Sequence, residues 1–342
     1  MNLRLLFWES TTACNLQCVH CRRLDVATEL SKRDMCTDQV KKFISTLPEV
    51  GKGGGAIFVF SGGEPLKRPD IFELAHHAHS IGLTTALATN ATLITEQTAK
   101  QIRETNIHRV SVSFDGPDAK THDHFRGSGS FGAAIAGAKQ LRNQNISLQI
   151  NSTIARHNYH ELDRIYDLAL SLTADALHLF MLVPVGCGME LPESTMLHPT
   201  EYEKALHWIY GRSLENKLQM KATCAPHYFR VMRQRGTPSP IGTKGCLAGQ
   251  AVAFVSHTGE VFPCGYLPVS SGNVTVTPFP QIWRESKVFA TLRDDSNLHG
   301  KCGLCEFKKI CMGCRARAYA KTNNYLAEEP NCDFVPTRMR SK

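Results

Sequence analysis

The 342-residue sequence has no stretch that approaches about 18 consecutive apolar residues, so it offers no transmembrane helix. Its N-terminus, MNLRLLFWES, lacks the basic region, apolar stretch and small-residue cleavage site of a secretory signal peptide. Lysines and arginines are scattered, so the net charge of +8 suits an anionic small partner better than nucleic acid. We expect a globular cytoplasmic protein with no membrane span and no nucleic-acid partner.

The sequence does contain 13 cysteines, and clustered cysteines in the reducing cytoplasm more often bind metal than form disulfides. Three of them, Cys14, Cys18 and Cys21, lie in the stretch CNLQCVHC. A structural zinc site needs four protein ligands, and the one local candidate, His20, sits between two of the cysteines, where shared coordination is unfavourable. Three thiolates suit an iron-sulfur cubane with one open iron. On spacing alone, zinc and unrelated thiols remain alternatives.

Short apolar runs alternate with amphipathic stretches over residues 1 to about 185. This alternation predicts a parallel sheet with right-handed crossovers, as an α/β fold built on a partial (β/α)6 barrel. Active sites of such folds gather at the carboxyl ends of the strands, where the cysteine triplet and the segments SGGEP, ATN and SFDG lie. The expected strands cover 3–9, 56–62, 84–90, 109–116, 148–154 and 176–184, and the helices 38–48, 69–81, 95–104, 130–144 and 160–172.

The sequence changes character after residue 186. Residues 199–216 have helical periodicity, 233–245 form a Gly/Pro-rich loop, and 251–265 are typical of a hairpin with its turn at His257–Gly259. A second group of cysteines follows. We therefore expect a barrel over 1–195, a helical linker or substrate region over 196–245, and a smaller cysteine-rich iron-sulfur domain over 246–336.

The C-x3-C-x2-C spacing after the first strand resembles the cluster loop of radical S-adenosylmethionine (SAM) enzymes, and SGGEP after the second strand resembles their GGEP motif. The resemblance implies that Cys14, Cys18 and Cys21 hold a 4Fe-4S cluster whose open iron binds SAM. One electron would then cleave SAM to a 5′-deoxyadenosyl radical. The implied SAM contacts, one group per strand end, are Gly62, Gly63, Glu64, Pro65, Asn90, Ser113, Asp115 and Arg126.

The downstream cysteines are similar to the seven-cysteine SPASM domain of radical SAM enzymes that mature peptides and cofactors. Their central run ends in C-x2-C where the family pattern often has C-x3-C, which leaves the ligand assignment open. The resemblance implies one or two auxiliary 4Fe-4S clusters, and two zinc sites are the alternative, because CGLC and CMGC are good zinc-knuckle spacings. The implied ligands are Cys302, Cys305, Cys311 and Cys332 for one cluster, and Cys246, Cys264 and Cys314 for another, with Cys224 as a candidate fourth.

Three further stretches, 177–191, 223–236 and 245–274, are similar to the heme synthases of the siroheme-derived pathway, the AhbD type. The resemblance spans about residues 3–336. It implies the oxidative decarboxylation of two propionates of Fe-coproporphyrin III to vinyl groups, giving heme b. The radical would take hydrogen from the β carbon of a propionate, and carbon dioxide and one electron would leave. An auxiliary cluster would accept that electron, and a flavodoxin- or ferredoxin-type donor would supply electrons to the first cluster.

An anionic tetrapyrrole with four carboxylates requires cations and hydrogen-bond donors in its site. For each candidate, a surface or structural role is the alternative. His227 is also a candidate axial ligand to the porphyrin iron. The candidate substrate residues are Arg22, Arg23, His178, Cys187, His227, Tyr228 and Arg230.

Three other functions compete with this one. A NirJ-type enzyme of heme d1 synthesis would act on a siroheme derivative, although VPVGCG and TCAPH favour heme synthase. A peptide-maturing SPASM enzyme often carries an N-terminal peptide-binding domain, for which Cys14 comes too early. A zinc-binding interaction module would leave SGGEP, ATN and SFDG without a role.

Overall fold

The computed structural model describes residues 2–23, 27–51, 55–238 and 244–340. In these ranges, ten strands form one sheet in the order β10-β9-β8-β1-β2-β3-β4-β5-β6-β7. Seven consecutive parallel strands make up most of it. They are β1 (Leu5–Glu9), β2 (Ile57–Ser61), β3 (Thr84–Thr89), β4 (Arg109–Ser113), β5 (Ser147–Ile154), β6 (Ala176–Met181) and β7 (Gln219–Thr223).

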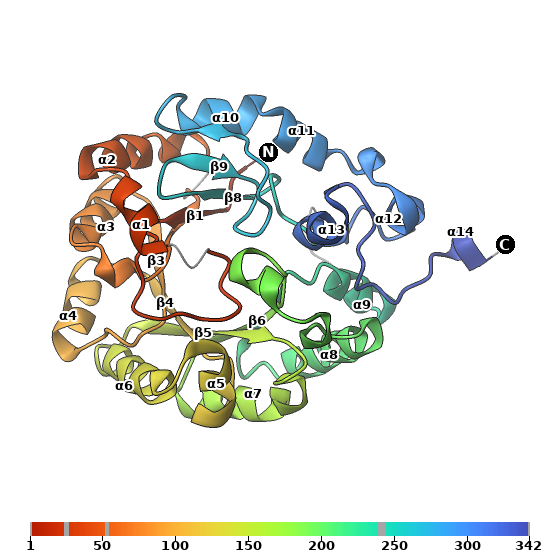
Figure 1. Ribbon diagram of the computed structural model, residues 1–342, viewed down its shortest axis with the longest axis horizontal. Helices are drawn as coiled ribbons and strands as arrows, with labels where there is room; N and C mark the ends of the chain where they lie inside the picture. The colour runs from red at the N-terminus through yellow and green to blue at the C-terminus, as the bar shows by residue number, and fades with distance from the viewer. Residues whose placement is uncertain (1, 24–26, 52–54, 239–243, 341–342) are drawn as a thin grey trace.

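Amphipathic helices cover the outside of the curved sheet, as Figure 1 shows. In α4, for example, Ala99 and Ile102 are fully buried whereas Lys100 and Arg103 are exposed. This 3.6-residue periodicity directs one face of each helix to the sheet and the other to water. The covering helices are α2 (Thr37–Ser45), α3 (Ile71–Ser80), α4 (Glu96–Glu104), α6 (Ser130–Asn143), α7 (Leu162–Ser171) and α8 (Pro199–Ser213).

The strands alternate between this helix-covered core and the inner face of the sheet. In β5, Leu148 and Ile150 are fully buried, whereas Gln149, Asn151 and Thr153 are partly exposed. Successive side chains of a strand point to opposite faces, so the partly exposed set lies on the inner face. The inner face of β5 is therefore polar and partly accessible to solvent.

The expected strands and helices of the first 185 residues are present within a few residues of their predicted bounds, which confirms the α/β fold with a barrel-like parallel sheet. The region 196–245, expected as a helical linker, contains α8 and also the strand β7. A further helix, α5 (Ala119–Arg126), follows β4 and was not expected. Its end carries Arg126, which points back toward the cluster-bearing segment.

The C-terminal region joins the same sheet. The expected hairpin forms from β8 (Val252–Val255) and β9 (Glu260–Phe262), and β8 pairs in parallel with β1. Figure 1 shows β8 and β9 beside β1. None of the described helices is long and apolar enough to span a membrane. The remaining elements are α1 (Ala27–Leu30), α9 (His227–Gln234), β10 (Gly272–Asn273), α10 (Phe279–Glu285), α11 (Lys287–Arg293), α12 (Gly300–Leu304), α13 (Arg315–Thr322) and α14 (Thr337–Arg340).

Candidate active site and iron-sulfur centres

Residues 10–23, named the cluster loop below, follow β1 and carry the three N-terminal cysteines, all partly exposed. The backbone N–H of Leu16 donates to Cys14 Sγ at 3.4 Å, and Arg126 Nη1 lies 4.0 Å from Cys18 Sγ. Burial raises the pKa of Cys18 to about 11, whereas the positive charge of Arg126 acts in the opposite direction and favours the thiolate. Hydrogen bonds to sulfur are typical of iron-sulfur ligands, and the loop fits a 4Fe-4S cluster held by three cysteines.

Two candidate substrate arginines bind within the protein. Arg22 Nη2 lies 2.7 Å from Glu9 Oε1, and its guanidinium lies 4.2 Å from the ring centroid of Phe254. Arg23 donates to two carbonyls of the cluster loop at 2.6 and 3.3 Å. Cys187 donates from its thiol to the carbonyl of Arg23 at 3.0 Å. These contacts fix the end of the cluster loop, and a substrate role for these three residues stays a prediction.

The two glycines of SGGEP pack directly against the cluster loop. The N–H of Gly63 donates to the carbonyl of Thr11 at 2.7 Å, and that of Glu64 donates to Ala13 at 2.8 Å. A Cβ on Gly63 would lie 2.3 Å from the oxygen of Ala13, and one on Gly62, where φ is +145°, would lie 2.5 Å from that of Thr11. Only glycine permits this approach, so the motif sets the position of the cluster loop.

Glu64 links the ends of β2 and β3. Its fully buried carboxylate accepts hydrogen bonds from Thr89 Oγ1 at 2.8 and 2.9 Å and from the N–H of Asn90 at 2.9 Å. Pro65, also buried, begins a short 3-10 helix. The amide of Asn90 donates to Asn15 Oδ1 at 3.0 Å and lies 3.9 Å from Cys14 Sγ. The predicted SAM contacts on β2 and β3 therefore meet at the cluster loop.

Asp115, beyond the end of β4, has no exposed surface. It accepts from Arg126 Nε at 2.5 Å and from the N–H of Thr153 at 2.7 Å, and lies 3.2 Å from His20 Nε2. Burial would raise the pKa of Asp115, but Arg126 and His20 hold it far below its ordinary value. Because Asp115 is buried and bound to Arg126, it is placed to orient Arg126 rather than to contact SAM directly. Ser113, at the end of β4, faces the inner side and is partly exposed.

His20 is a site residue that sequence reasoning considered only as a metal ligand. Its ring stacks on Phe125 with centroids 4.5 Å apart, and its Nε2 faces Asp115. Its position between two cluster cysteines was the available signal.

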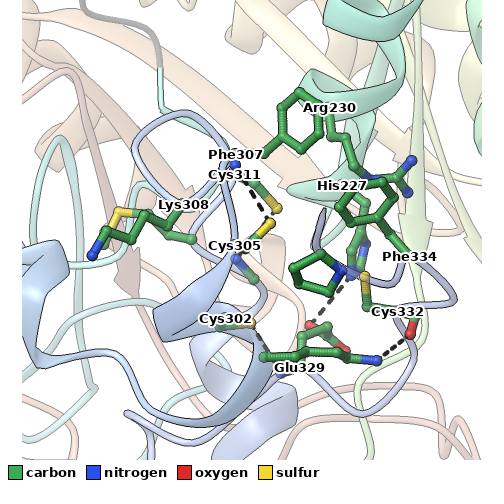
Figure 2. Close-up of a pocket in the computed structure, with 14 residues that line it drawn as sticks. His227, Arg230, Cys302, Cys305, Phe307, Lys308, Cys311, Glu329, Cys332 and Phe334 are labelled. Atoms are coloured by element: carbon green, nitrogen blue, oxygen red, sulfur yellow. Dashed lines mark hydrogen bonds and ion pairs between the residues drawn. The ribbon is translucent and has the colours of Figure 1, made fainter. Parts of the chain in front are cut away.

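The Cys302 group consists of Cys302, Cys305, Cys311 and Cys332, which line one cavity. Figure 2 shows them around this space, with Glu329 close to Cys302. Backbone N–H groups donate to Cys305 and Cys311 Sγ at 3.4 Å each and to Cys302 Sγ at 3.3 Å. Arg315 Nη2 lies 3.8 Å from Cys302 Sγ. Donors again converge on sulfur, so the group fits an auxiliary cluster.

The Cys314 group consists of Cys224, Cys246, Cys264 and Cys314. Cys224 and Cys264 pack against the apolar cluster that contains Cys314. A hydrogen bond from Cys224 lowers the pKa of Cys314 to about 7, while burial raises that of Cys264 to about 12. The structure thus brings together Cys224, Cys264 and Cys314, whereas Cys246 packs against the apolar cluster that contains Cys302.

Three other candidate substrate residues lie away from the inner face. His227, 1% exposed, lines the cavity of the Cys302 group. Arg230 pairs with Glu203 at 2.5 Å, and the hydroxyl of Tyr228 donates to Ser213 Oγ at 3.2 Å. Of the candidate substrate residues, His178 alone is carried by a barrel strand, on the inner face of β6. The structure therefore does not bring these candidates together into one site.

Within the described residues, no three His, Cys, Asp or Glu side chains lie close enough together to share one metal ion.

Residues 8–169 match the Radical SAM superfamily, and residues 246–315 match SPASM, an iron-sulfur cluster-binding domain. The AdoMet-dependent heme synthase of Methanosarcina barkeri (strain Fusaro) is 47% identical, covering 97% of this chain and 97% of that relative. The AdoMet-dependent heme synthase of Nitratidesulfovibrio vulgaris (strain Hildenborough) is 43% identical and covers 98% and 94%.

The crystal structure of SuiB from Streptococcus suis, bound to precursor peptide SuiA, has a TM-score of 0.79 at 16% identity. It covers 98% of this chain and 77% of SuiB, and at this identity it shows the shared fold alone. The radical SAM and SPASM assignments predicted from the cysteine motifs are confirmed by the family matches. The heme-synthase family predicted from the stretches 177–191, 223–236 and 245–274 is confirmed by the relatives. The chain belongs to the family of AdoMet-dependent heme synthases, and it is a radical SAM enzyme that uses SAM and 4Fe-4S clusters.

Proposed function

We propose that the protein is a heme synthase that converts two propionates of Fe-coproporphyrin III into vinyl groups, giving heme b. The observation that carries this proposal is the 47% identity, over essentially the whole chain, to an AdoMet-dependent heme synthase. Per propionate, the β carbon loses a hydrogen atom, the carboxylate leaves as carbon dioxide, and one electron is released as the vinyl double bond forms. Two such rounds complete the reaction.

The residues of the barrel suit this chemistry. Bound SAM and its 4Fe-4S cluster supply the radical that abstracts hydrogen. Cys14, Cys18 and Cys21 would hold that cluster, and Arg126, held by Asp115, would direct its charge at the SAM carboxylate. Gly62 and Gly63 keep the cluster loop against β2, while Glu64 joins that motif to Asn90. The chain's own contribution is to position these groups on one rigid edge of the sheet.

We propose two auxiliary clusters, one per cysteine group, that provide an acceptor for the released electron. The support is geometric: each group contains four cysteines, and N–H donors point at three sulfurs of the Cys302 group. The chain would then divide into a barrel over 1–195, a substrate region over 196–245 and a cluster domain over 246–336. We further propose a cytoplasmic site of action and a flavodoxin- or ferredoxin-type donor, since the reaction needs low-potential electrons.

The test is an anaerobic assay of reconstituted protein with SAM, a reductant and Fe-coproporphyrin III, with tetrapyrroles analysed by mass. We expect two successive losses of the elements of formic acid, with 5′-deoxyadenosine formed. A Cys14→Ala variant is the control and should form neither product. Loss of whole propionates from a siroheme derivative would instead support the NirJ-type function. Formation of 5′-deoxyadenosine with unchanged tetrapyrrole would overturn the substrate assignment.

A further inference from the structure

A polar row crosses the inner face of the sheet from β4 to β7. Ser113 pairs in register with Asn151, Asn151 with His178, and His178 with Lys221. Residues paired in register on parallel strands project from the same face. Ser113, Asn151 and His178 are partly exposed and Lys221 is exposed, so the whole row is accessible to a ligand.

The row lies next to the predicted SAM site. Ser113 is the last residue of β4 and stands two positions before Asp115, which holds Arg126. Lys221 stands two residues before the end of β7, and His178 three before the end of β6. Because parallel strands end at the same edge, a substrate that reaches SAM from the inner face passes these side chains.

Among the described residues, no carboxylate forms an ion pair with the row, although the thiol of Cys224 lies close enough to Lys221 to interact with its charge. Neither Lys221 nor His178 has a hydrogen-bond or ion-pair partner among the residues that the structure describes. Burial lowers the pKa of His178 to about 3, and the neighbouring cations Lys221 and Arg109 contribute to this shift. An ammonium without an ion-pair partner favours a carboxylate, with which it forms a charge-assisted hydrogen bond.

Other cations near the cluster loop are already engaged. Arg22 pairs with Glu9, Arg126 with Asp115, and Arg23 donates to loop carbonyls. Arg109, on the same face, donates to Ser147 Oγ and Gln219 Oε1, whereas Lys221 donates to none of the described residues, so its charge is available to a ligand.

Asn151 adds a donor beside the ammonium. Gln149 Nε2 donates to Asn151 Oδ1 at 2.7 Å. This contact occupies the amide oxygen and leaves the amide nitrogen as a donor on the inner face, next to the imidazole of His178. One charged and two neutral donors in a row suit the two oxygens of a carboxylate.

We propose that Lys221, His178 and Asn151 form a carboxylate subsite that binds one propionate of the tetrapyrrole beneath SAM. The subsite rests on the proposed function, because that function supplies the carboxylate-bearing substrate. Lys221 anchors the carboxylate as a point charge, and His178 and Asn151 orient it. These are binding residues, and they take no part in SAM cleavage.

The test compares Lys221→Met with Lys217→Met, a matched control on a lysine that is 61% exposed at its side chain and pairs with Glu215. Both variants are reconstituted, and binding of Fe-coproporphyrin III is titrated by absorbance in the presence of SAM. Because Lys221→Met loses one charge-assisted contact, its affinity for Fe-coproporphyrin III should be about 10- to 100-fold lower than that of the wild-type protein. Lys217→Met should bind with wild-type affinity. Lys221→Arg should restore most of the affinity.

Two measurements exclude a folding defect. The iron content and the uncoupled formation of 5′-deoxyadenosine should be unchanged in Lys221→Met. The tetramethyl ester of the tetrapyrrole, which lacks carboxylates, should bind wild type and Lys221→Met with equal affinity.

If Lys221→Met binds Fe-coproporphyrin III as tightly as the wild-type protein does, the subsite is overturned. The heme-synthase proposal still stands in that case, provided that the wild-type protein converts Fe-coproporphyrin III to heme b. Conversely, wild type that fails to convert Fe-coproporphyrin III, but binds a siroheme-derived carboxylate in a Lys221-dependent way, would overturn the function and retain the subsite. An equal loss of affinity for the ester would also overturn the subsite, since the contact would then not be with carboxylate.

Discussion

Arg317 and Glu329 form a buried ion pair that contacts both C-terminal cysteine groups. Arg317 Nη1 lies 3.1 Å from Glu329 Oε1, and the two residues are 1% and 0% exposed. The N–H of Glu329 donates to Cys302 Sγ at 3.3 Å, while its Oε2 accepts from the N–H of Cys314 at 2.7 Å. Arg317 Nη2 donates to the carbonyl of Cys224 at 3.0 Å. One charge pair thus fixes the two groups relative to each other.

Replacing Glu329 by Gln should destabilise the protein by about 3–5 kcal/mol, because Arg317 would remain buried without a counter-charge. Burial would raise the pKa of Glu329, but Arg317 and His227 hold it below its ordinary value, so the native residue is charged at neutral pH. Urea unfolding and iron content measure the effect. Glu328→Gln, at an exposed neighbour, should change neither quantity. Equal stability of the two variants would show that the pair is dispensable.

Asp115→Asn should weaken SAM binding about 10-fold or more, because Arg126 loses the carboxylate that orients it. Equilibrium dialysis of SAM against reconstituted protein measures the change. Asp118→Asn is the control, since Asp118 caps α5 from a partly exposed position and asparagine caps equally well. Unchanged affinity in Asp115→Asn, with a correctly filled cluster, would contradict the positioning role.

Gly63→Ala should displace the cluster loop and reduce the iron content by about that of one 4Fe-4S cluster. The new Cβ would meet backbone oxygens of Thr12 and Ala13 at 2.5 and 2.3 Å, and backbone cannot move away as a flexible side chain can. Gly132→Ala, in α6, meets nothing within 4 Å and is the matched control. Iron analysis and electron paramagnetic resonance of both variants distinguish them. A full complement of iron in Gly63→Ala would show that the loop tolerates displacement.

Glu9 should make the fold sensitive to acid. Burial would raise its pKa, but Arg22 and His257 lower it from 4.5 to about 2. Because the folded pKa is depressed, its stabilisation is complete above pH 4.5 and disappears as the pH falls toward 2. Wild type should therefore lose about 3 kcal/mol relative to Glu9→Gln across this window. Urea unfolding of cluster-free protein measures the difference, and Glu104→Gln, at an exposed site, should follow wild type. If the free energy of unfolding of wild type and of Glu9→Gln changed in parallel with pH, the predicted role of Glu9 would be refuted.

Much of the fold could be predicted because the barrel strands and their covering helices have clean two-residue and 3.6-residue periodicity. Strand β7, with the sequence QMKAT, escaped prediction because Gln219 and Lys221 face the inner side, and only Ala222 is buried. Its apolar content is too low to indicate a strand. The cysteine groups were predictable through the family resemblance, since their members are separated by up to about a hundred residues.

Contacts between charged side chains were not predictable. Arg22 and Arg230 carried the right charge for a propionate, but Glu9 and Glu203 neutralise them in the folded protein. Glu329 stood in the sequence among polar residues typical of a surface turn, and only the fold buries it against Arg317. Pairing of this kind depends on three-dimensional neighbours, which spacing along one chain does not encode.

The pairing of β8 with β1 has a consequence for how the protein can be divided. Five residues of β1 bear the cluster loop at their end, and four of them are hydrogen-bonded to a strand from the cysteine-rich region. Ending the chain after residue 245 would leave β1 as an open edge, with unpaired backbone groups available to other molecules. The barrel and the cysteine-rich region are therefore not interchangeable modules: removing the second exposes the strand that supports the first.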